Sequence, residues 1–139
     1  MKVYNEKYGI IACGGAIHNR IQANISNVYT GILLHYVNYN TVSNCIISGV
    51  SNNGIECNWY SNGHIIEQNH ISDMTNAGIY INDNCNNEII SNNVVVKNND
   101  TLHSIYVAGT YNIVVDNQLS NKEYTNASNG TTNVFENNV

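Results

Sequence analysis

Residues 53–71 read Asn-Gly-Ile-Glu-Cys-Asn-Trp-Tyr-Ser-Asn-Gly-His-Ile-Ile-Glu-Gln-Asn-His-Ile, and versions of this stretch occur before and after it in the chain. Its first half begins with a small residue and an Ile, followed by apolar residues at every second position. Five such openings can be found, at Gly9-Ile10, Gly31-Ile32, Gly54-Ile55, Gly78-Ile79 and Ser104-Ile105. They start 22 to 26 residues apart, a period typical of solenoid proteins.

The second half of the stretch follows the pattern apolar-x-x-Asn-x-apolar, which is also found at residues 41–46, 90–95, 114–119 and 134–139. Thr replaces the first apolar residue at 41–46, and a version at 21–25 is one residue short. Stacked Asn amides can hydrogen-bond along a column, and Asn tolerates the left-handed backbone of a tight corner. The pattern therefore predicts an Asn ladder. Its expected members are Asn24, Asn44, Asn69, Asn93, Asn117 and Asn137.

The apolar residues of each opening lie two apart, as in Ile55 and Cys57 or Ile79 and Ile81. This is the period of a β-strand with one buried face, and no segment has the spacing of a long amphipathic helix. Short strands repeated at a near-constant period can bury their apolar face only by stacking turn on turn. The sequence therefore predicts an all-β, single-stranded parallel β-helix of about six turns, the last incomplete. The Cys57 thiol is expected to point into its core.

The chain has 139 residues, of which 42% are hydrophobic and 11% are charged, and it is expected to form one domain over residues 1–139. Repeat-like sequence begins almost at once, and Val139 occupies the last apolar slot of a repeat. Solenoids usually protect their end edges with capping elements. We therefore expect either a fragment of a longer chain or an oligomer that covers its own ends.

Composition argues against several classes of partner. The formal net charge is −5, and five Lys and Arg residues make no basic stripe, so we expect no nucleic acid partner. We expect no membrane partner, because no apolar run is long enough to span a bilayer. The first residues lack the apolar core of a signal peptide. The five His residues show no metal-ligand spacing, and we expect no metal and no cofactor.

The alternation of Gly-Ile openings with apolar-x-x-Asn-x-apolar segments resembles the repeat of right-handed, pectin-lyase-like parallel β-helix proteins, over roughly residues 8–139. That family includes pectate lyases, polygalacturonases, alginate epimerases, phage tailspike depolymerases and non-catalytic surface proteins. The resemblance implies a right-handed fold and a polysaccharide or oligosaccharide partner. It also favours an extracellular or virion-associated location. The lyase elements are missing, since Arg20 is the only Arg and has no acid cluster near it, and the polygalacturonase and epimerase motifs are missing too.

The residue after each opening Ile is expected to point outward in one column, composed of Ile11, Leu33, Glu56, Tyr80 and Tyr106. A few positions later come His35, Tyr36, Trp59, Tyr60 and Asp83. Aromatic rings beside carboxylates and amides form surfaces that bind sugars. His35, Tyr36, Trp59, Tyr80 and Tyr106 are therefore the candidate substrate-binding residues. The alternative is an aromatic stack that only stabilises the exposed face of the sheet.

Glu56 and Asp83 are the candidate catalytic acid and base. Their backbones are expected roughly 11 Å apart, from which side chains could reach the separation of an inverting glycosidase. Asp116 and Glu136 form a second pair, expected in one column, where they could serve as an acid pair, hold a hard cation such as calcium, or simply be two solvated acids. The outward apolar residues Ile11 and Leu33 favour a homo-oligomer, with a tailspike-like trimer as the form considered.

Three functions are compatible with the sequence. The first is a carbohydrate-interacting β-helix, with hydrolase or lyase activity of the tailspike type or binding alone. The second is a non-catalytic spacer, adhesin or assembly piece. The third is a truncated solenoid whose catalytic turns lie elsewhere in a parent protein.

Overall fold

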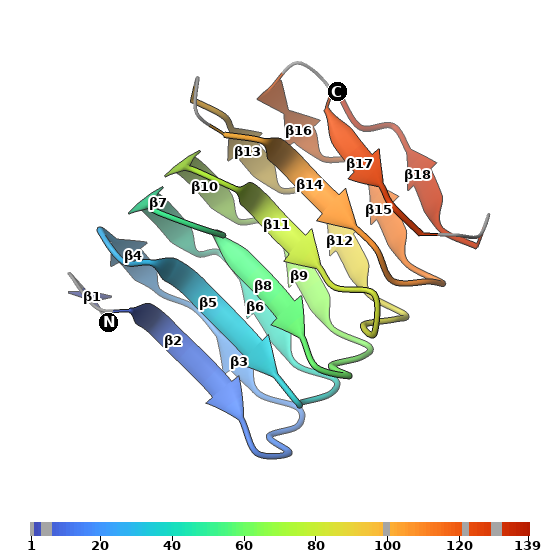
Figure 1. The fold of residues 1–139 in the computed structure, drawn as a ribbon, viewed down its shortest axis with the longest axis horizontal. Helices are drawn as coiled ribbons and strands as arrows, with labels where there is room; N and C mark the ends of the chain where they lie inside the picture. Colours follow the sequence, from blue (N-terminus) through green and yellow to red (C-terminus); the bar gives the residue numbers. More distant parts are fainter. Residues whose placement is uncertain (1, 4–6, 99–100, 121–122, 129–131) are drawn as a thin grey trace.

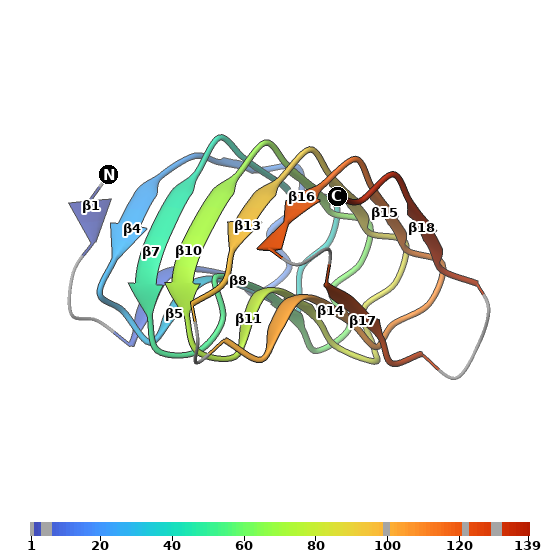
Figure 2. The same cartoon turned by 90° about the horizontal axis from the view of Figure 1, so that it is seen from above.

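The computed structural model describes residues 2–3, 7–98, 101–120, 123–128 and 132–139. The chain coils into a stack of turns, and each turn contributes one strand to each of three parallel sheets (Figure 1). Seen from above, successive turns lie one behind another along the length of the molecule (Figure 2). The predicted parallel β-helix is confirmed, and within the described residues each sheet contains six strands.

The first sheet is formed by the Gly-Ile segments. Its strands are β2 (Tyr8–Cys13), β5 (Thr30–His35), β8 (Ile55–Asn58), β11 (Ala77–Ile81), β14 (His103–Val107) and β17 (Tyr124–Asn126). The second sheet consists of β3 (Arg20–Ile21), β6 (Thr41–Ser43), β9 (Ile65–Glu67), β12 (Ile89–Ser91), β15 (Ile113–Val115) and β18 (Val134–Glu136). The third consists of β1 (Lys2–Val3), β4 (Asn24–Ser26), β7 (Ile46–Val50), β10 (His70–Met74), β13 (Val94–Val96) and β16 (Gln118–Leu119).

The core is a set of apolar columns that run along the inside of the coil. The opening Ile residues of the first sheet are in register, and Ile32, Ile55, Ile79 and Ile105 are fully buried. Cys57 occupies the next inward slot of β8 and is also fully buried, as predicted. Because each column is apolar and continuous, burial of these side chains stabilises every turn against its neighbours.

A glycine precedes the opening Ile because neighbouring turns approach closely there. A Cβ atom on Gly31 would lie 2.4 Å from the carbonyl oxygen of Gly54, and one on Gly78 would lie 2.7 Å from that of Ser104. Such contacts are well inside van der Waals distance, so a side chain at these slots requires the turns to move apart.

The predicted Asn ladder is present at the corner between the second and third sheets. Asn93 Oδ1 accepts the backbone N–H of Asn69 at 3.0 Å, and Asn117 Oδ1 accepts that of Asn93 at 2.9 Å. Asn69 Nδ2 donates in turn to the carbonyl of Val42 at 3.0 Å, and the Asn93 amide does the same one turn later. The ladder therefore satisfies backbone and side-chain groups that the tight corner would otherwise bury unpaired.

The ladder departs from the prediction at its ends, where the repeats slip by one residue. Cys45 and Asn138 occupy the ladder slots expected for Asn44 and Asn137, as their hydrogen bonds to Asn69 and Asn117 show. Asn44 and Asn137 instead hold the left-handed position before each slot, with φ of 54° and 52°. Asn24 lies outside the ladder, on the exposed side of β4. The shared Asn-rich composition hid this slip, because both positions accept Asn.

A second column of hydrogen-bonded side chains precedes the second sheet; its four central members are buried, and the sequence did not predict it. It runs through Asn19, Asn40, His64, Glu88, Asn112 and Asn133, each linked by hydrogen bonds to the next. His64 and Glu88 thus fill slots that Asn fills in the other turns.

Within the part of the chain that the structure describes, no helix is long and apolar enough to cross a membrane.

Candidate functional site

The outward face of the first sheet carries the expected column in register. Leu33 pairs with Glu56, Glu56 with Tyr80, and Tyr80 with Tyr106. Leu33 is only 8% exposed, so the apolar patch expected from Ile11 and Leu33 is reduced to Ile11 alone. The patch was one of two grounds for expecting self-association, the other being the edges at the two ends of the solenoid, and self-association stays a prediction.

Glu56 is held by two amides from its own turn. Asn53 Nδ2 donates to Oε2 at 2.9 Å, and Asn58 Nδ2 donates to Oε1 at 3.0 Å. Each carboxylate oxygen therefore accepts one hydrogen bond from a side chain whose position is itself fixed, because Asn53 is buried and Asn58 ends β8. This arrangement orients the carboxylate and favours it as a hydrogen-bond acceptor.

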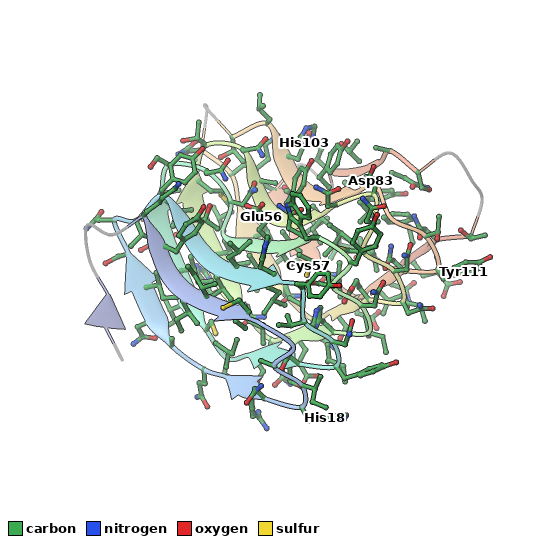
Figure 3. All side chains as sticks on the ribbon, turned by 60° about the horizontal axis from the view of Figure 1, so that its bottom comes forward. His18, Glu56, Cys57, Asp83, His103 and Tyr111 are labelled. Atoms are coloured by element: carbon green, nitrogen blue, oxygen red, sulfur yellow. The ribbon has the colours of Figure 1, made fainter. Side chains whose placement is uncertain are left out.

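Tyr80 lies within electrostatic reach of both candidate carboxylates. Partial burial raises the pKa of its phenol above the usual value, and Tyr106 and the charges of Glu56 and Asp83 add to the rise. Glu56 and Asp83 are 27 positions apart in the sequence, and both raise the pKa of the same Tyr80 hydroxyl. Glu56, Asp83 and His103 also lie toward the same side of the molecule in Figure 3, whereas His18 lies on the opposite side.

The corner that follows the first sheet repeats one local motif in successive turns. The side-chain oxygen of Asn58 accepts the backbone N–H of Trp59 at 2.8 Å, and that of Asn82 accepts the N–H of Asp83 at 2.7 Å. Asn82 Nδ2 donates to Asn58 Oδ1 at 3.2 Å, which joins the two motifs. Trp59 and Asp83 therefore occupy equivalent corners of adjacent turns.

A hollow of about 290 Å³ opens at this corner, lined by Asn58, Trp59, Tyr60, Asn82 and Asn84. Its walls combine two exposed aromatic rings with three amide side chains. Such a lining offers apolar stacking surfaces together with both donors and acceptors. The hollow adjoins the hydrogen-bonded carboxylate of Glu56, because Asn58 lines the hollow and also donates a hydrogen bond to Glu56.

The aromatic residues of this corner adopt an unusual backbone. Tyr36, Trp59 and Tyr60 have φ of 58°, 51° and 58°, a left-handed conformation that bulky residues rarely adopt. The corresponding corner after β2 uses Gly14 and Gly15, with φ of 68° and 81°. The corners after β2, β5 and β8 thus contain left-handed residues, and the second and third of them place large exposed rings where glycine would be free of strain. Strain of this kind clusters at functional sites.

The remaining predicted residues extend this surface along the sheet. The His35 and Trp59 rings are tilted at 51° with centroids 5.9 Å apart, and Tyr36 is 62% exposed at the preceding corner. Tyr80 and Tyr106 stack on the strand face, and the His103 ring lies 5.1 Å from that of Tyr106. Sequence reasoning missed His103 and the amides of Asn58, Asn82 and Asn84. The 24-residue spacing of Asn58 and Asn82 was the available signal.

The second acid pair does not form the expected column. Glu136 pairs with Val115 rather than with Asp116, because the last turn is displaced by one residue relative to the predicted register. Asp116 has φ of 56° and holds the left-handed position of its corner. The two residues are therefore offset by one position and do not stack in one column.

Comparison with known proteins assigns the fold. The family model described as "Right handed beta helix region" matches residues 1–139, which confirms the handedness that the resemblance implied. Searches of curated proteins and of solved structures gave no significant match. Membership fits a carbohydrate-related or a structural β-helix in general and selects no activity. The chain belongs to the right-handed β-helix family.

Proposed function

We propose that the corner formed by Trp59, Tyr60 and the amides of Asn58, Asn82 and Asn84 binds a neutral oligosaccharide. The observation that carries the proposal is the placing of exposed aromatic rings on left-handed backbone around a hollow lined by amides. A pyranose ring presents an apolar face that stacks on aromatic rings, and its hydroxyls both donate and accept hydrogen bonds. The hollow supplies partners of both kinds.

The shape of the surface favours an extended ligand over a single sugar. His35 and Tyr36 continue the aromatic surface toward the N-terminal turns, and Tyr80 and Tyr106 continue it along the strand face. Neighbouring turns are spaced at about 4.8 Å, so one sugar residue spans roughly one turn. A chain of sugars lying along the coil axis would contact several of these rings in sequence.

Charge favours a neutral glycan. The chain carries a formal net charge of −5, and Glu56 and Asp83 lie beside the surface. An anionic polymer would be repelled by this field, particularly at low salt. The hydrogen-bond clamp also keeps Glu56 available as an acceptor for sugar hydroxyls.

A hydrolytic role for the same surface is a second candidate. Both carboxylates raise the pKa of Tyr80, so a glycosidic bond held near that hydroxyl would have both acids within electrostatic reach. In an inverting reaction, the protonated form of Asp83, whose carboxyl group accepts no side-chain hydrogen bond from the described residues, would donate its proton to the leaving oxygen. Glu56 would activate the attacking water as general base.

Trp59 is the only Trp of the chain, so its fluorescence reports on the hollow directly. We would titrate the protein with a panel of neutral and acidic oligosaccharides and follow Trp59 emission. The expected result is a saturable change with neutral glycans of several sugars. Tyr60→Ala should weaken binding by about twofold to tenfold, as expected for loss of an aromatic contact of about 0.5–1.5 kcal/mol.

Tyr29→Ala is the matched control, because Tyr29 is 47% exposed but lies before β5, outside the surface. It should leave binding unchanged. Binding that is equally weakened by both variants, or absent across the panel, would leave a structural β-helix as the better account. Products with new reducing ends that disappear in Glu56→Gln would add the hydrolytic role.

A further inference from the structure

Three buried side chains from two adjacent turns converge inside the coil, away from the aromatic surface. Cys57 points inward from β8, and His64 precedes β9 in the same turn. Glu88 precedes β12 one turn later. All three are fully buried, and a sulfur, a ring nitrogen and a carboxylate oxygen from them lie within 4.8 Å of one another.

The polar atoms of this cluster are not satisfied by the protein. His64 Nδ1 accepts the backbone N–H of Asn40 at 3.0 Å, and Glu88 Oε2 accepts the backbone N–H of His64 at 2.7 Å. The second atom of each group, His64 Nε2 and Glu88 Oε1, is buried without a hydrogen-bond partner in the described structure. Orphaned polar atoms cost about 1–3 kcal/mol each when buried, so two of them in adjacent slots of one column favour a ligand that would satisfy both.

The two residues are not needed to build the column. Asn40 and Asn112 occupy the flanking slots and accept backbone N–H groups through their side-chain oxygens. An amide at positions 64 and 88 would serve the ladder in the same way. His and Glu add only the longer reach that brings a nitrogen and an oxygen toward Cys57.

We propose that Cys57, His64 and Glu88 form a structural site for one zinc-like divalent cation. Thiolate, imidazole and carboxylate are the ligands that zinc takes in proteins. Two anionic ligands would neutralise a divalent ion, which is the condition for placing it in an apolar interior. The bound cation would join two turns of the coil through side chains, in addition to the backbone pairing of their strands.

The distances require a modest contraction. Zinc bonds of about 2.0–2.3 Å place tetrahedral ligand atoms roughly 3.3–3.8 Å apart, compared with separations of up to 4.8 Å in the structure. Side-chain rotation of Glu88 and Cys57 can supply the difference.

Burial sets the protonation of the empty cluster. It lowers the pKa of His64 to about 4 and raises those of Glu88 and Cys57 well above their usual values. In the absence of a cation, burial therefore favours the uncharged forms of the imidazole, the carboxyl group and the thiol. Cation binding displaces the protons of the acid and the thiol to solvent and forms bonds to the carboxylate and thiolate.

The imidazole must also change tautomer. With Nδ1 accepting from Asn40, Nε2 carries the ring proton. A cation at Nε2 requires the ring proton to be on Nδ1. That tautomer gives up the hydrogen bond from the Asn40 N–H to Nδ1, so cation binding requires the ring to shift relative to Asn40. The bound and empty states therefore differ in which ring nitrogen is protonated.

The test uses the whole chain, refolded with Zn²⁺ or Co²⁺ because the buried site must be filled during folding. We expect one equivalent of metal after dialysis, and for Co²⁺ a tetrahedral visible spectrum with thiolate charge-transfer bands. Removal by a chelator during unfolding should lower the Tm of the refolded protein. Cys57→Ala and His64→Asn should each lose at least about nine-tenths of the bound metal.

His64→Asn is the informative variant, because Asn is the residue of the flanking slots and should preserve the coil. Cys13→Ser is the matched control, since Cys13 is an exposed thiol outside the cluster, and it should retain full metal binding. Metal retained in His64→Asn, or no metal bound by the folded wild type, would overturn the proposal. In the second case a buried water that bridges the three groups would be the occupant.

Discussion

Tyr80 and Tyr106 lie in register on β11 and β14, with ring centroids 4.7 Å apart and ring planes 4° from parallel. Such a pair stabilises the sheet by about 0.5–1.5 kcal/mol beyond the area it buries. We expect Tyr106→Ala to lower the free energy of unfolding by about 1–2 kcal/mol in urea denaturation. Tyr106→Phe keeps the ring and should lose much less. Equal losses in both variants would assign the effect to the hydroxyl.

The raised pKa of Tyr80 predicts a pH dependence in alkali. An unfolded chain releases the phenol proton near pH 10, whereas burial, Tyr106, Glu56 and Asp83 hold it on the folded protein to higher pH. The folded state then binds more protons than the unfolded state, so this stabilisation is present below pH 10 and is lost as pH rises through the folded pKa. Ultraviolet titration of the Tyr residues should show one late-ionising group. In Glu56→Gln that group should ionise at lower pH.

The Asn ladder should tolerate substitution poorly at its centre. Asn93→Ala removes the acceptor for the backbone N–H of Asn69 and the donor to the carbonyl of Ile66. Because both backbone groups would be buried without partners, we expect a loss of about 2–4 kcal/mol in the free energy of unfolding. Asn24→Ala, on the exposed side of β4, should cost less than about 0.5 kcal/mol. A cost for Asn93 as small as that for Asn24 would contradict the ladder.

Adding even one methyl group at the glycine position before the opening Ile should lower the stability of the protein. In Gly78→Ala the new Cβ would lie 2.3 Å from Val95 Cγ1 and 2.7 Å from the Ser104 carbonyl oxygen, and we expect a loss of about 1–3 kcal/mol. Ser104 fills the same slot one turn later, and its buried hydroxyl lacks a partner among the residues described. Ser104→Ala should therefore be neutral or stabilising. Thermal unfolding of the two variants would separate these outcomes.

The strained aromatic corner should show a conflict between stability and binding. Trp59→Gly relieves a left-handed conformation that costs a bulky residue about 1–2 kcal/mol, offset in part by the greater entropy that Gly loses on folding. We expect a gain of about 0.5–1 kcal/mol in the free energy of unfolding. Glycan binding, measured by calorimetry because the fluorophore is removed, should fall below detection. A destabilised variant would mean that the ring of Trp59 is structural.

The sequence predicted the coil well because period-two apolar residues and a 24-residue spacing act locally and repeat. It placed Cys57 inward and aligned Glu56, Tyr80 and Tyr106 correctly, since these residues lie in regular strands. It erred where the repeat length changes, at Cys45 and near Glu136, because a slip of one residue leaves an Asn-rich pattern almost unchanged.

The interior cluster was beyond sequence reasoning for a different reason. Cys57, His64 and Glu88 have no ligand spacing along the chain, and they meet only because 24 residues complete one turn between His64 and Glu88. The corner hollow was predicted only in part, since Trp59 was identified as a binding residue. The amides that line it were hidden among many other Asn residues.

The ladders also determine how the molecule would respond to mechanical force. Backbone hydrogen bonds between strands link each turn mainly to its immediate neighbours, so a pull on the two chain ends would peel turns away one at a time. Each turn of about 24 residues would release roughly 80 Å of extended chain. If the interior cluster binds a cation, the cation would cross-link the turns that contain Cys57 and Glu88. Separating these two turns would then require a higher force than separating the others.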